Sequence, residues 1–271
     1  MVLQKIKRKL IQIIIFLKYR NNPFGNKPHG TQKEYLRLFN EIKDKKYEII
    51  DQIEKESGYK IDKNWLDTLA LQTQIVKKKN LLNYQHGRLI YSILRKYLKS
   101  KNKSDKINIL ETGTARGFSS VCMAKAMIDS DYQGTINTID IIPNNKKIFW
   151  NCISDLSGKK TRLELLEPWK NELNYINFIE GLTSTSLKKN YFNRINFAFL
   201  DAQHDKESVL EEYNFVNQRQ KAGDIIIFDD VSKNFNEIKL AIKQIKNQNL
   251  YNLKILEFPN ESRGYAIAEK I

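Results

Sequence analysis

Apolar residues between positions 107 and 128 follow two different periods, which predict a strand, a tight turn and a helix. The run at 107–110 suits a buried parallel strand, and Gly113 and Gly117 follow it closely. From Phe118 onward, apolar residues recur at helical spacing. Such a turn places free backbone N–H groups at the carboxyl edge of a sheet and at the N-terminus of a helix. Nucleotide-like ligands bind at that position in α/β folds.

The alternation of short apolar runs with helical periods continues to the C-terminus. Further strands are predicted at 135–140, 175–179, 195–200 and 225–228, and helices at 148–156, 183–188 and 205–219. Strands that alternate with helices favour an α/β fold with a mostly parallel sheet wound on both faces. The last two runs, 251–258 and 264–269, predict a closing antiparallel hairpin.

Helical periods precede the sheet and predict an N-terminal helical cap. They cover 34–57, which ends at Gly58, and then 65–77 and 85–99. A polar stretch, 99–105, connects the last of them to the first strand. We therefore divide the chain into a basic arm with a linker (1–30), a helical cap (31–104) and a ligand-binding catalytic domain (105–271).

The arm, residues 1–20, contains six basic residues and no acidic residue around the apolar run 10–17. This run is too short to span a bilayer, which needs about 20 apolar residues, and no small-residue cleavage site of a signal peptide follows it. The pattern indicates a basic amphipathic helix with Leu3, Ile6, Leu10, Ile13 and Leu17 on one face. It predicts contact either with an anionic membrane or a partner, or with the protein's own body. We expect a cytoplasmic protein that can attach peripherally to the inner face of the membrane.

The composition adds a net charge of +15 and two cysteines. Such a charge is compatible with nucleic acid, an anionic membrane or an acidic substrate. The lysines are spread along the chain, so local groups of charges are better guides than the total. Cys122 and Cys152 form no C-x-x-C pair, which argues against a disulfide framework and a zinc site. Cys122 follows the glycine turn on the apolar helix and is expected in the core.

An acidic residue, Asp140, ends the second predicted strand about 20 residues after the glycine turn, where a carboxylate can bind ribose hydroxyls. The alternative is a turn residue at a strand end. Residues 107–271 resemble the class I S-adenosylmethionine-dependent methyltransferases. The resemblance rests on the motif Glu111-Thr-Gly113-Thr-Ala-Arg-Gly117 and on Asp140. Residues 107–271 look most like the metal-dependent O-methyltransferases of the catechol and sugar-modifying types. The resemblance implies a seven-stranded, mostly parallel, doubly wound sheet that ends in an antiparallel hairpin.

The resemblance also implies S-adenosylmethionine as the cofactor. It assigns cofactor contacts to Glu111, Gly113, Thr114, Gly117 and Asp140. A loop that wraps the adenine in the family corresponds to residues 180–184, where Leu182 replaces the usual acid. Only Gly181 and Thr183 therefore carry over from that loop. Gln85 and His86, in the last cap helix, are candidates for cofactor or substrate contacts, or alternatively for packing against the sheet.

Three carboxylates follow the ends of two predicted strands: Asp201 after the strand 195–200, and Asp229 and Asp230 after the strand 225–228. Such strand ends meet at one crevice, and three hard oxygen donors suit a Mg²⁺ ion. Their spacing resembles that of the metal ligands in both O-methyltransferase types. Asp230, where the catechol type has Asn, is closer to the sugar-modifying type. The alternative is that Asp201 caps the helix that follows it.

Methyl transfer to oxygen requires that the acceptor is aligned with the methyl group and loses its proton. A hydroxyl bound to a metal ion has a lowered pKa, and a nearby base can then remove its proton. His204, three residues after Asp201, is predicted as this general base, and Asp201 is predicted as the second catalytic residue. The catechol type has a catalytic lysine at this place, so the sequence departs from that pattern. The alternative for His204 is a loop residue or a supporting hydrogen-bonding group.

These observations favour an S-adenosylmethionine-dependent O-methyltransferase, assisted by Mg²⁺, that acts on a hydroxyl of a sugar, of a glycan precursor for polysaccharide biosynthesis, or of another polar small molecule. A metal-independent small-molecule methyltransferase is the nearest alternative. An RNA- or DNA-modifying methyltransferase is favoured by the charge, but no N-P-P-[FY] motif follows the fourth strand and no nucleic-acid-binding domain is evident. A non-enzymatic basic adaptor is the third alternative, against which the intact motif residues argue.

Overall fold

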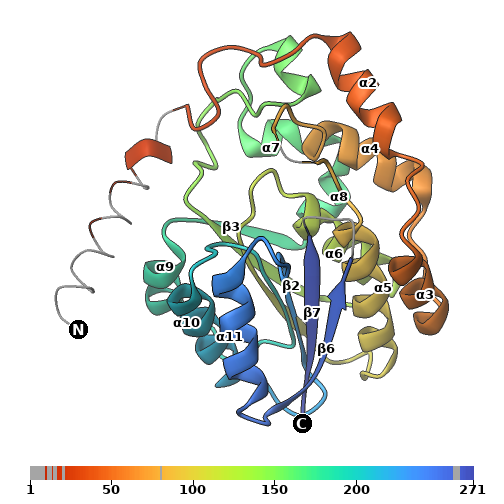
Figure 1. Cartoon of the computed structure of the whole chain (residues 1–271), viewed down its shortest axis with the longest axis vertical. Coiled ribbons are helices and arrows are strands. Elements are labelled where there is room, and N and C mark those ends of the chain that lie inside the picture. The colour runs from red at the N-terminus through yellow and green to blue at the C-terminus, as the bar shows by residue number, and fades with distance from the viewer. Residues whose placement is uncertain (1–9, 11–13, 15–16, 20–21, 80, 259–262) are drawn as a thin grey trace.

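The protein is built around one seven-stranded sheet with the order β3-β2-β1-β4-β5-β7-β6. The computed structural model describes residues 10, 14, 17–19, 22–79, 81–258 and 263–271. Five strands are parallel: β1 (Ile107–Thr112), β2 (Gly134–Asp140), β3 (Ile176–Glu180), β4 (Phe197–Leu200) and β5 (Ile225–Phe228). The last two, β6 (Tyr251–Glu257) and β7 (Gly264–Lys270), form the predicted hairpin, with β7 antiparallel to β5. The predicted sheet is thereby confirmed (Figure 1).

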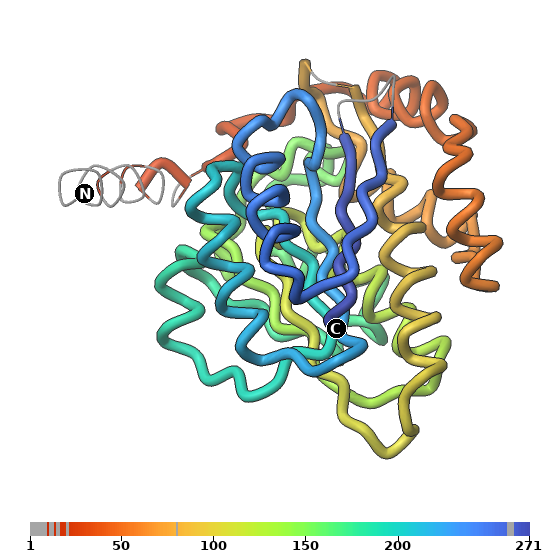
Figure 2. The backbone as a smooth tube through the Cα atoms, turned by 60° about the horizontal axis from the view of Figure 1, so that its bottom comes forward, coloured from red at the N-terminus to blue at the C-terminus, as the bar shows by residue number. Residues whose placement is uncertain are grey.

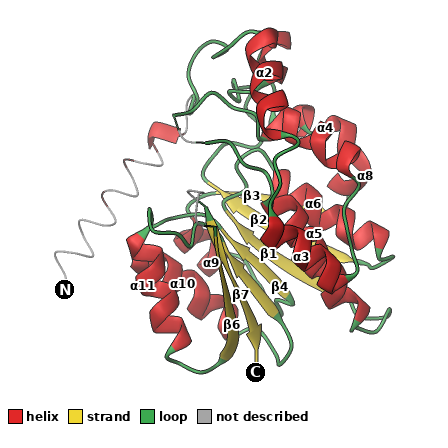
Figure 3. Ribbon diagram, turned by 45° about the vertical axis from the view of Figure 1, so that its right-hand side comes forward, coloured by secondary structure: helices red, strands yellow, loops and turns green. Residues whose placement is uncertain are grey.

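Helices cover both faces of the sheet, as Figure 3 shows. One face carries α5 (His86–Lys99), α6 (Phe118–Asp129) and α8 (Lys170–Leu173), and the other carries α9 (Thr183–Lys189), α10 (Lys206–Asn217) and α11 (Asn236–Lys246). Successive strand residues point to opposite faces, so Phe197 and Phe199 join the core under α5 and α6 while Ala198 and Leu200 join the core under α10 and α11. The burial of β4 and β5 on both faces explains their continuous apolar runs.

The cap consists of α2 (Gln32–Ile42), α3 (Glu48–Ser57), α4 (Lys63–Thr73) and α5, and it shares one hydrophobic core with the sheet. Its buried residues, such as Tyr35, Ile50 and Leu69, belong to the same cluster as Phe118 and Phe199. The hairpin also reaches the cap, because the rings of Phe258 and Tyr47 pack edge to face at 6.4 Å. Figure 2 shows this end of the hairpin beside the cap. The division into arm, cap and catalytic domain stays a prediction.

Two local predictions are wrong. The segment 34–57 is not one helix, since residues 43–47 leave the helical path and a new helix starts at Glu48. The segment 148–156 is not an α-helix: Ile148 pairs with Lys160 in an isolated bridge, and the 3₁₀ turn η1 (Ile153–Ser157) follows. The carboxylate of Asp155 accepts hydrogen bonds from the N–H groups of Trp150, at 2.7 Å, and of Cys152, at 3.3 Å. These bonds stabilise a turn instead of a helix.

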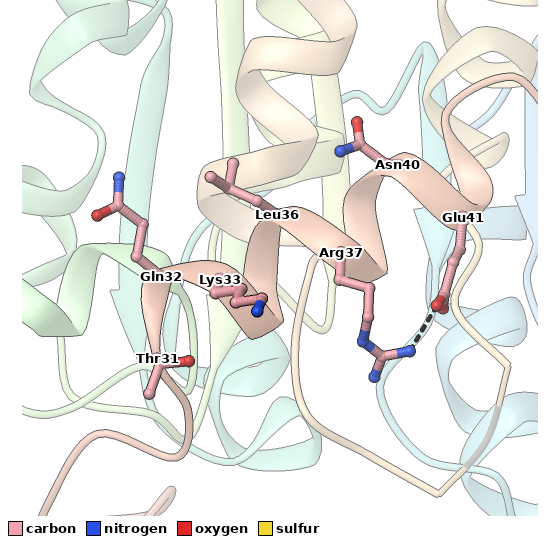
Figure 4. A pocket seen from close by; sticks show the side chains of 7 residues that line it. All are labelled: Thr31, Gln32, Lys33, Leu36, Arg37, Asn40 and Glu41. Carbon is pink, nitrogen blue, oxygen red and sulfur yellow. Dashed lines mark hydrogen bonds and ion pairs between the residues drawn. The ribbon is translucent and has the colours of Figure 1, made fainter.

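The structure adds elements that the sequence analysis did not assign. They are α11 and the short segments α7 (Arg162–Leu165), η2 (Glu167–Trp169) and α8. An open depression on the surface of α2 is lined by Thr31 and six residues of that helix (Figure 4). All of the lining comes from α2 and its N-cap residue, Thr31. The depression therefore has no second wall to enclose a ligand, and we assign it no function.

Most of the arm lies outside the described residues, so its predicted helix over 1–20 is not addressed. Of its apolar face, Leu10 and Leu17 are described, and both are more than half exposed. In the part of the chain that the structure describes, no helix is both long and apolar enough to cross a bilayer.

Candidate active site

The carboxyl edge of the sheet brings four of the predicted site residues into one row. Thr112 at the end of β1 pairs with Ile139 of β2 and with Leu200 of β4, and Leu200 pairs with Phe228 of β5. The next residue on each strand is therefore also in register. These residues are Asp140, Gly113, Asp201 and Asp229. A ligand at this edge meets all four strand ends, as at the binding crevice of other open α/β sheets.

Glycine is required at the first position of the turn. Gly113 has φ +90°, and a Cβ atom there would lie 2.1 Å from the carbonyl oxygen of Asp201. The backbones of β1 and β4 thus approach each other where only glycine fits. Gly117, with φ +87°, ends the turn as the N-cap of α6, and a Cβ atom there would lie 2.6 Å from Leu166.

The turn is tied to Asp140. Oδ2 of Asp140 accepts a hydrogen bond from the N–H of Ala115 at 2.6 Å, and Oδ1 accepts one from the N–H of Ile142 at 2.8 Å. Ala115 has φ +46°, a conformation that alanine rarely adopts. Asp140 therefore has the turn role named as its alternative and also fixes the glycine turn. Its contact with a ribose stays a prediction.

Glu111 and Thr114 support the turn from the protein interior. The wholly buried carboxyl group of Glu111 accepts hydrogen bonds from the hydroxyls of Ser119, Ser120 and Thr138. Burial raises the pKa of Glu111, and these hydroxyls oppose that rise. The Oγ1 atoms of Thr114 and Thr138 lie 2.5 Å apart. Both side chains bind protein partners, and their predicted cofactor contacts stay predictions.

Arg162, on α7, is a supporting residue that the sequence analysis missed. Its Nε donates to the carbonyl oxygen of Ala115 at 3.1 Å, and its Nη1 and Nη2 donate to Asn144 and to the carbonyl of Ile142. The side chain is nearly fully buried, with its guanidinium 5.5 Å from the rings of Trp150 and Phe178. It joins the glycine turn to the loop after β2. Nothing in its local sequence marks this role.

The loop after β3 holds the other two predicted cofactor residues. The N–H of Gly181 donates to the carbonyl oxygen of Asp140 at 2.7 Å, and its φ of +153° suits glycine. Thr183 is half-buried and begins α9. The structure thus places this loop next to the end of β2, and the adenine contact itself stays a prediction.

The three predicted metal-binding carboxylates surround one arginine that the sequence analysis also missed. Nη2 of Arg263 lies 2.7 Å from Oδ2 of Asp229 and 3.7 Å from Oδ2 of Asp201, and its Nε lies 3.6 Å from Oδ1 of Asp230. Asp229 is fully buried, and burial raises its pKa to about 6 although Arg263 opposes the rise. Burial and the nearby charge of Asp229 also raise the pKa of Asp201.

His204 stands beside this group and is oriented by Asp230. Its Nε2 lies 2.8 Å from Oδ2 of Asp230 and 3.9 Å from Oδ1 of Asp201, and its ring stacks on Phe235 at 4.9 Å. The helix-cap alternative for Asp201 is excluded, because Asp205 caps α10 through the N–H of Ser208. The side chain of His204 is 40% exposed, so a substrate can reach it.

Gln85 and His86 lie under the site, at the start of α5. His86 is buried, with its ring 4.7 Å from that of Phe118, and its Nδ1 lies 3.1 Å from Nη1 of Arg263. The Oε1 atom of Gln85 accepts a hydrogen bond from Arg88 at 2.9 Å. Both residues therefore pack and bind within the protein, as their alternative interpretation held, and their ligand contacts stay predictions.

The arrangement offers a base, an orienting carboxylate and a small cavity. The cavity is lined by Asp201, Gln203, His204, Glu212 and Asp229, among others. One donor atom each from Asp201, His204 and Asp230 lie within 4.8 Å of one another, which is close enough for shared binding of a cation. Asp229 is not in that group, and its oxygens accept hydrogen bonds from the N–H of Asp230 and from Arg263.

Comparison with known proteins agrees with this geometry. Residues 110–231 match the family model of a methyltransferase domain. An O-methyltransferase from Bacillus cereus, solved in complex with SAH, is similar with a TM-score of 0.51 and 14% identity, over 86% of this chain and 96% of that one. The O-methyltransferase TomG from Streptomyces achromogenes, involved in tomaymycin synthesis and solved with SAM, also has a TM-score of 0.51 and 14% identity, over 86% and 94% of the two chains. A search of curated proteins gave no significant match.

At these identities the two structures establish the fold. The chain has the class I methyltransferase fold, and residues 110–231 match the family model of a methyltransferase domain. The predicted fold class and the predicted resemblance to the class I methyltransferases are confirmed.

Proposed function

We propose that this chain, which carries a methyltransferase domain, transfers the methyl group of S-adenosylmethionine to a hydroxyl oxygen of a sugar or of another polar small molecule. The observation that carries the proposal is the pair His204–Asp230, held at 2.8 Å beside the glycine turn at the same sheet edge. A base next to the place where α/β folds bind nucleotides is what methyl transfer to a hydroxyl requires.

The glycine turn and Asp140 supply the cofactor half of the site. The turn leaves room for a ligand to approach the backbone of Gly113 and the N-terminus of α6. Asp140 and the loop at Gly181 lie next to it, so the ribose and the adenine would lie toward β2 and β3. The sulfonium end of the cofactor would then point toward β4 and β5, where His204 lies.

The proton of the acceptor hydroxyl would pass to His204. Its Nε2 faces Asp230, so Nδ1 would accept the proton while Asp230 holds the ring in position. The hydroxyl oxygen forms its bond to the methyl carbon as the bond from that carbon to sulfur breaks, and S-adenosylhomocysteine leaves. Alignment of these three atoms is the larger part of the catalysis. The exposure of the His204 side chain and the carboxylates beside it support a polar acceptor.

The magnesium-assisted form of the reaction has mixed support. The donors of Asp201, His204 and Asp230 lie close enough for a cation, but Arg263 contacts the carboxylates of both aspartates. A guanidinium and a metal ion at the same carboxylates repel each other. The donor set therefore does not fit a metal ion while Arg263 is in place, and no step of the reaction is assigned to one.

Calorimetric titration with S-adenosylmethionine tests whether the chain binds this cofactor. The proteins compared are the wild type, Asp140→Ala and a control, Asp44→Ala. The side chain of Asp44 lies in the cap and is 71% exposed. We expect saturable binding to the wild type and the control, and binding weaker by about 10- to 100-fold in Asp140→Ala through the loss of charged hydrogen bonds. No binding to a folded wild type would overturn the proposal. Saturable binding would justify a screen of nucleotide sugars and glycolipids with radiolabelled cofactor.

A further inference from the structure

We propose that Arg263 is the resident cation of the acid cluster, defined as Asp201, Asp229 and Asp230, and that it takes the place in which a divalent metal ion is expected. Its guanidinium lies within 4 Å of a carboxylate oxygen of each of the three residues. The inference concerns charge at this cluster and does not rest on the proposed methyl transfer.

A nearby cation favours the charged form of the carboxylates in this cluster. Asp229 is fully buried, and the side chains of Asp201 and Asp230 are only 21% and 14% exposed. Carboxylates this close repel one another strongly where water is largely excluded, and each loses hydration. The short contact with Asp229 is a charge-assisted hydrogen bond, the stronger kind of protein hydrogen bond.

Arg263 is also held from the opposite side. Its Nη1 lies 3.1 Å from Nδ1 of the buried His86 and 3.4 Å from the carbonyl oxygen of Asn83. Burial and the nearby charge of Arg263 lower the pKa of His86, so its ring stays neutral and its Nδ1 can accept a hydrogen bond. The cap and the sheet edge thus fix the guanidinium between them. This is a built position and not a side chain that rests on the surface.

The position excludes a metal ion. A divalent cation bound by Asp201 and Asp230 would lie beside a guanidinium that contacts the same two carboxylates. Their mutual repulsion in a site of low dielectric would weaken metal binding, and removal of Arg263 would leave an uncompensated group of oxygen donors, which suits a hard divalent cation.

Titration with Mn²⁺ alone, as a paramagnetic probe for divalent cations, tests the inference on the wild type, Arg263→Gln and Arg263→Lys. We expect no saturable binding to the wild type in the micromolar range, and at least about tenfold tighter binding to Arg263→Gln, in which the positive charge is lost. Arg263→Lys keeps the charge and should resemble the wild type. A shift of the melting temperature with Mn²⁺ in Arg263→Gln only would report the same difference without any assay of activity.

Arg88→Gln is the matched control, because Arg88 also joins two carboxylates, those of Asp51 and Glu54, and is 14% exposed. Saturable micromolar binding of Mn²⁺ to the wild type would overturn the inference, even if no variant folds. Equal Mn²⁺ binding by Arg263→Gln and the wild type would overturn it too. An equal gain in Arg88→Gln would show that the gain is not specific to the cluster, with the same consequence.

Discussion

Nε2 of His204 lies 2.8 Å from Oδ2 of Asp230, and Asp230 holds this position from a backbone with φ +57°. Non-glycine residues adopt that conformation at a cost, and aspartate tolerates it better than most. Asp230, which orients the proposed base, thus has an unusual backbone conformation, two residues after the end of β5.

Substitution of His204 tests its role as the base. His204→Ala is expected to lower kcat for methyl transfer by about 10²- to 10⁴-fold, the usual share of general base catalysis, and to leave S-adenosylmethionine binding unchanged. Asp230→Asn keeps the tolerance for a positive φ but weakens the orientation of the ring, so a smaller loss of kcat is expected. Radiolabelled methyl transfer to the acceptor found by the screen gives kcat and KM. An unchanged kcat in His204→Ala would exclude this residue as the base.

Gly113 should be far more sensitive to substitution than another glycine of similar backbone. Gly113→Ala places a Cβ atom 2.1 Å from the Asp201 carbonyl oxygen, whereas Gly58, with φ +76°, has no atom within 4 Å of such a Cβ. Both alanines bear the strain of a positive φ, about 1–2 kcal/mol. We expect Gly113→Ala to lose about 2 kcal/mol more than Gly58→Ala, through backbone displacement. Urea unfolding measures the difference, and equal losses would contradict the close approach of β1 and β4.

Glu111 should make stability depend on pH in a definite direction. Because burial raises its pKa in the folded protein, the folded state holds the proton more tightly than the unfolded chain. Its contribution to stability is full below the ordinary value of 4.5 and is lost as pH rises through the folded-state pKa. Glu111→Gln should therefore remove part of the decline in the free energy of unfolding as the pH rises above 4.5. Urea unfolding over a pH series measures the slope, and parallel slopes for both proteins would contradict the prediction.

The two cysteines should be chemically inert in the folded protein. Cys122 and Cys152 are both buried free thiols, and burial raises the pKa of Cys152 to about 11 and that of Cys122 well above its usual range. Thiolate is the reactive form, so a disulfide reagent such as DTNB should react with neither until the protein unfolds. The reaction followed with and without urea measures this. Rapid reaction of one thiol in the native protein would contradict its burial.

The basic arm is proposed to bind an anionic membrane. Its six basic residues should contribute about 1 kcal/mol each near such a surface, and the attraction should weaken with salt. Sedimentation with vesicles that contain phosphatidylserine is expected for the whole chain and not for a variant without residues 1–20. Vesicles of neutral lipid serve as the control. Equal sedimentation of both proteins would favour the alternative in which the arm contacts the protein's own body.

The row of site residues could be predicted because its members are local in the sequence. Asp140, Asp201 and Asp229 directly follow predicted strands and Gly113 closely follows one, and a parallel sheet brings such strand ends to one edge. The same reasoning applies to the closing hairpin, in which two apolar runs flank a turn. Their chemical roles are a further step that the strand pattern alone does not decide.

Arg162 and Arg263 could not be found in this way. Arg162 reaches the glycine turn from a helix of four residues, and Arg263 reaches the acid cluster from the position just before β7. Both are long side chains whose partners lie far away in the sequence, so no local period marks them. The error at 148–156 has a related cause, because the side chain of Asp155 accepts hydrogen bonds from the N–H groups of Trp150 and Cys152, which in a helix would donate to carbonyl oxygens of the preceding turn.

The place of Arg263 in the chain also sets an order of events during synthesis. Asp201, Asp229 and Asp230 leave the ribosome before the arginine that contacts all three, and β7, which joins the sheet beside β5, follows only after it. A nascent chain that stops short of residue 263 would have to bury an uncompensated carboxylate, which is strongly unfavourable. The carboxyl edge of the sheet can therefore consolidate around these carboxylates only after residue 263 has left the ribosome.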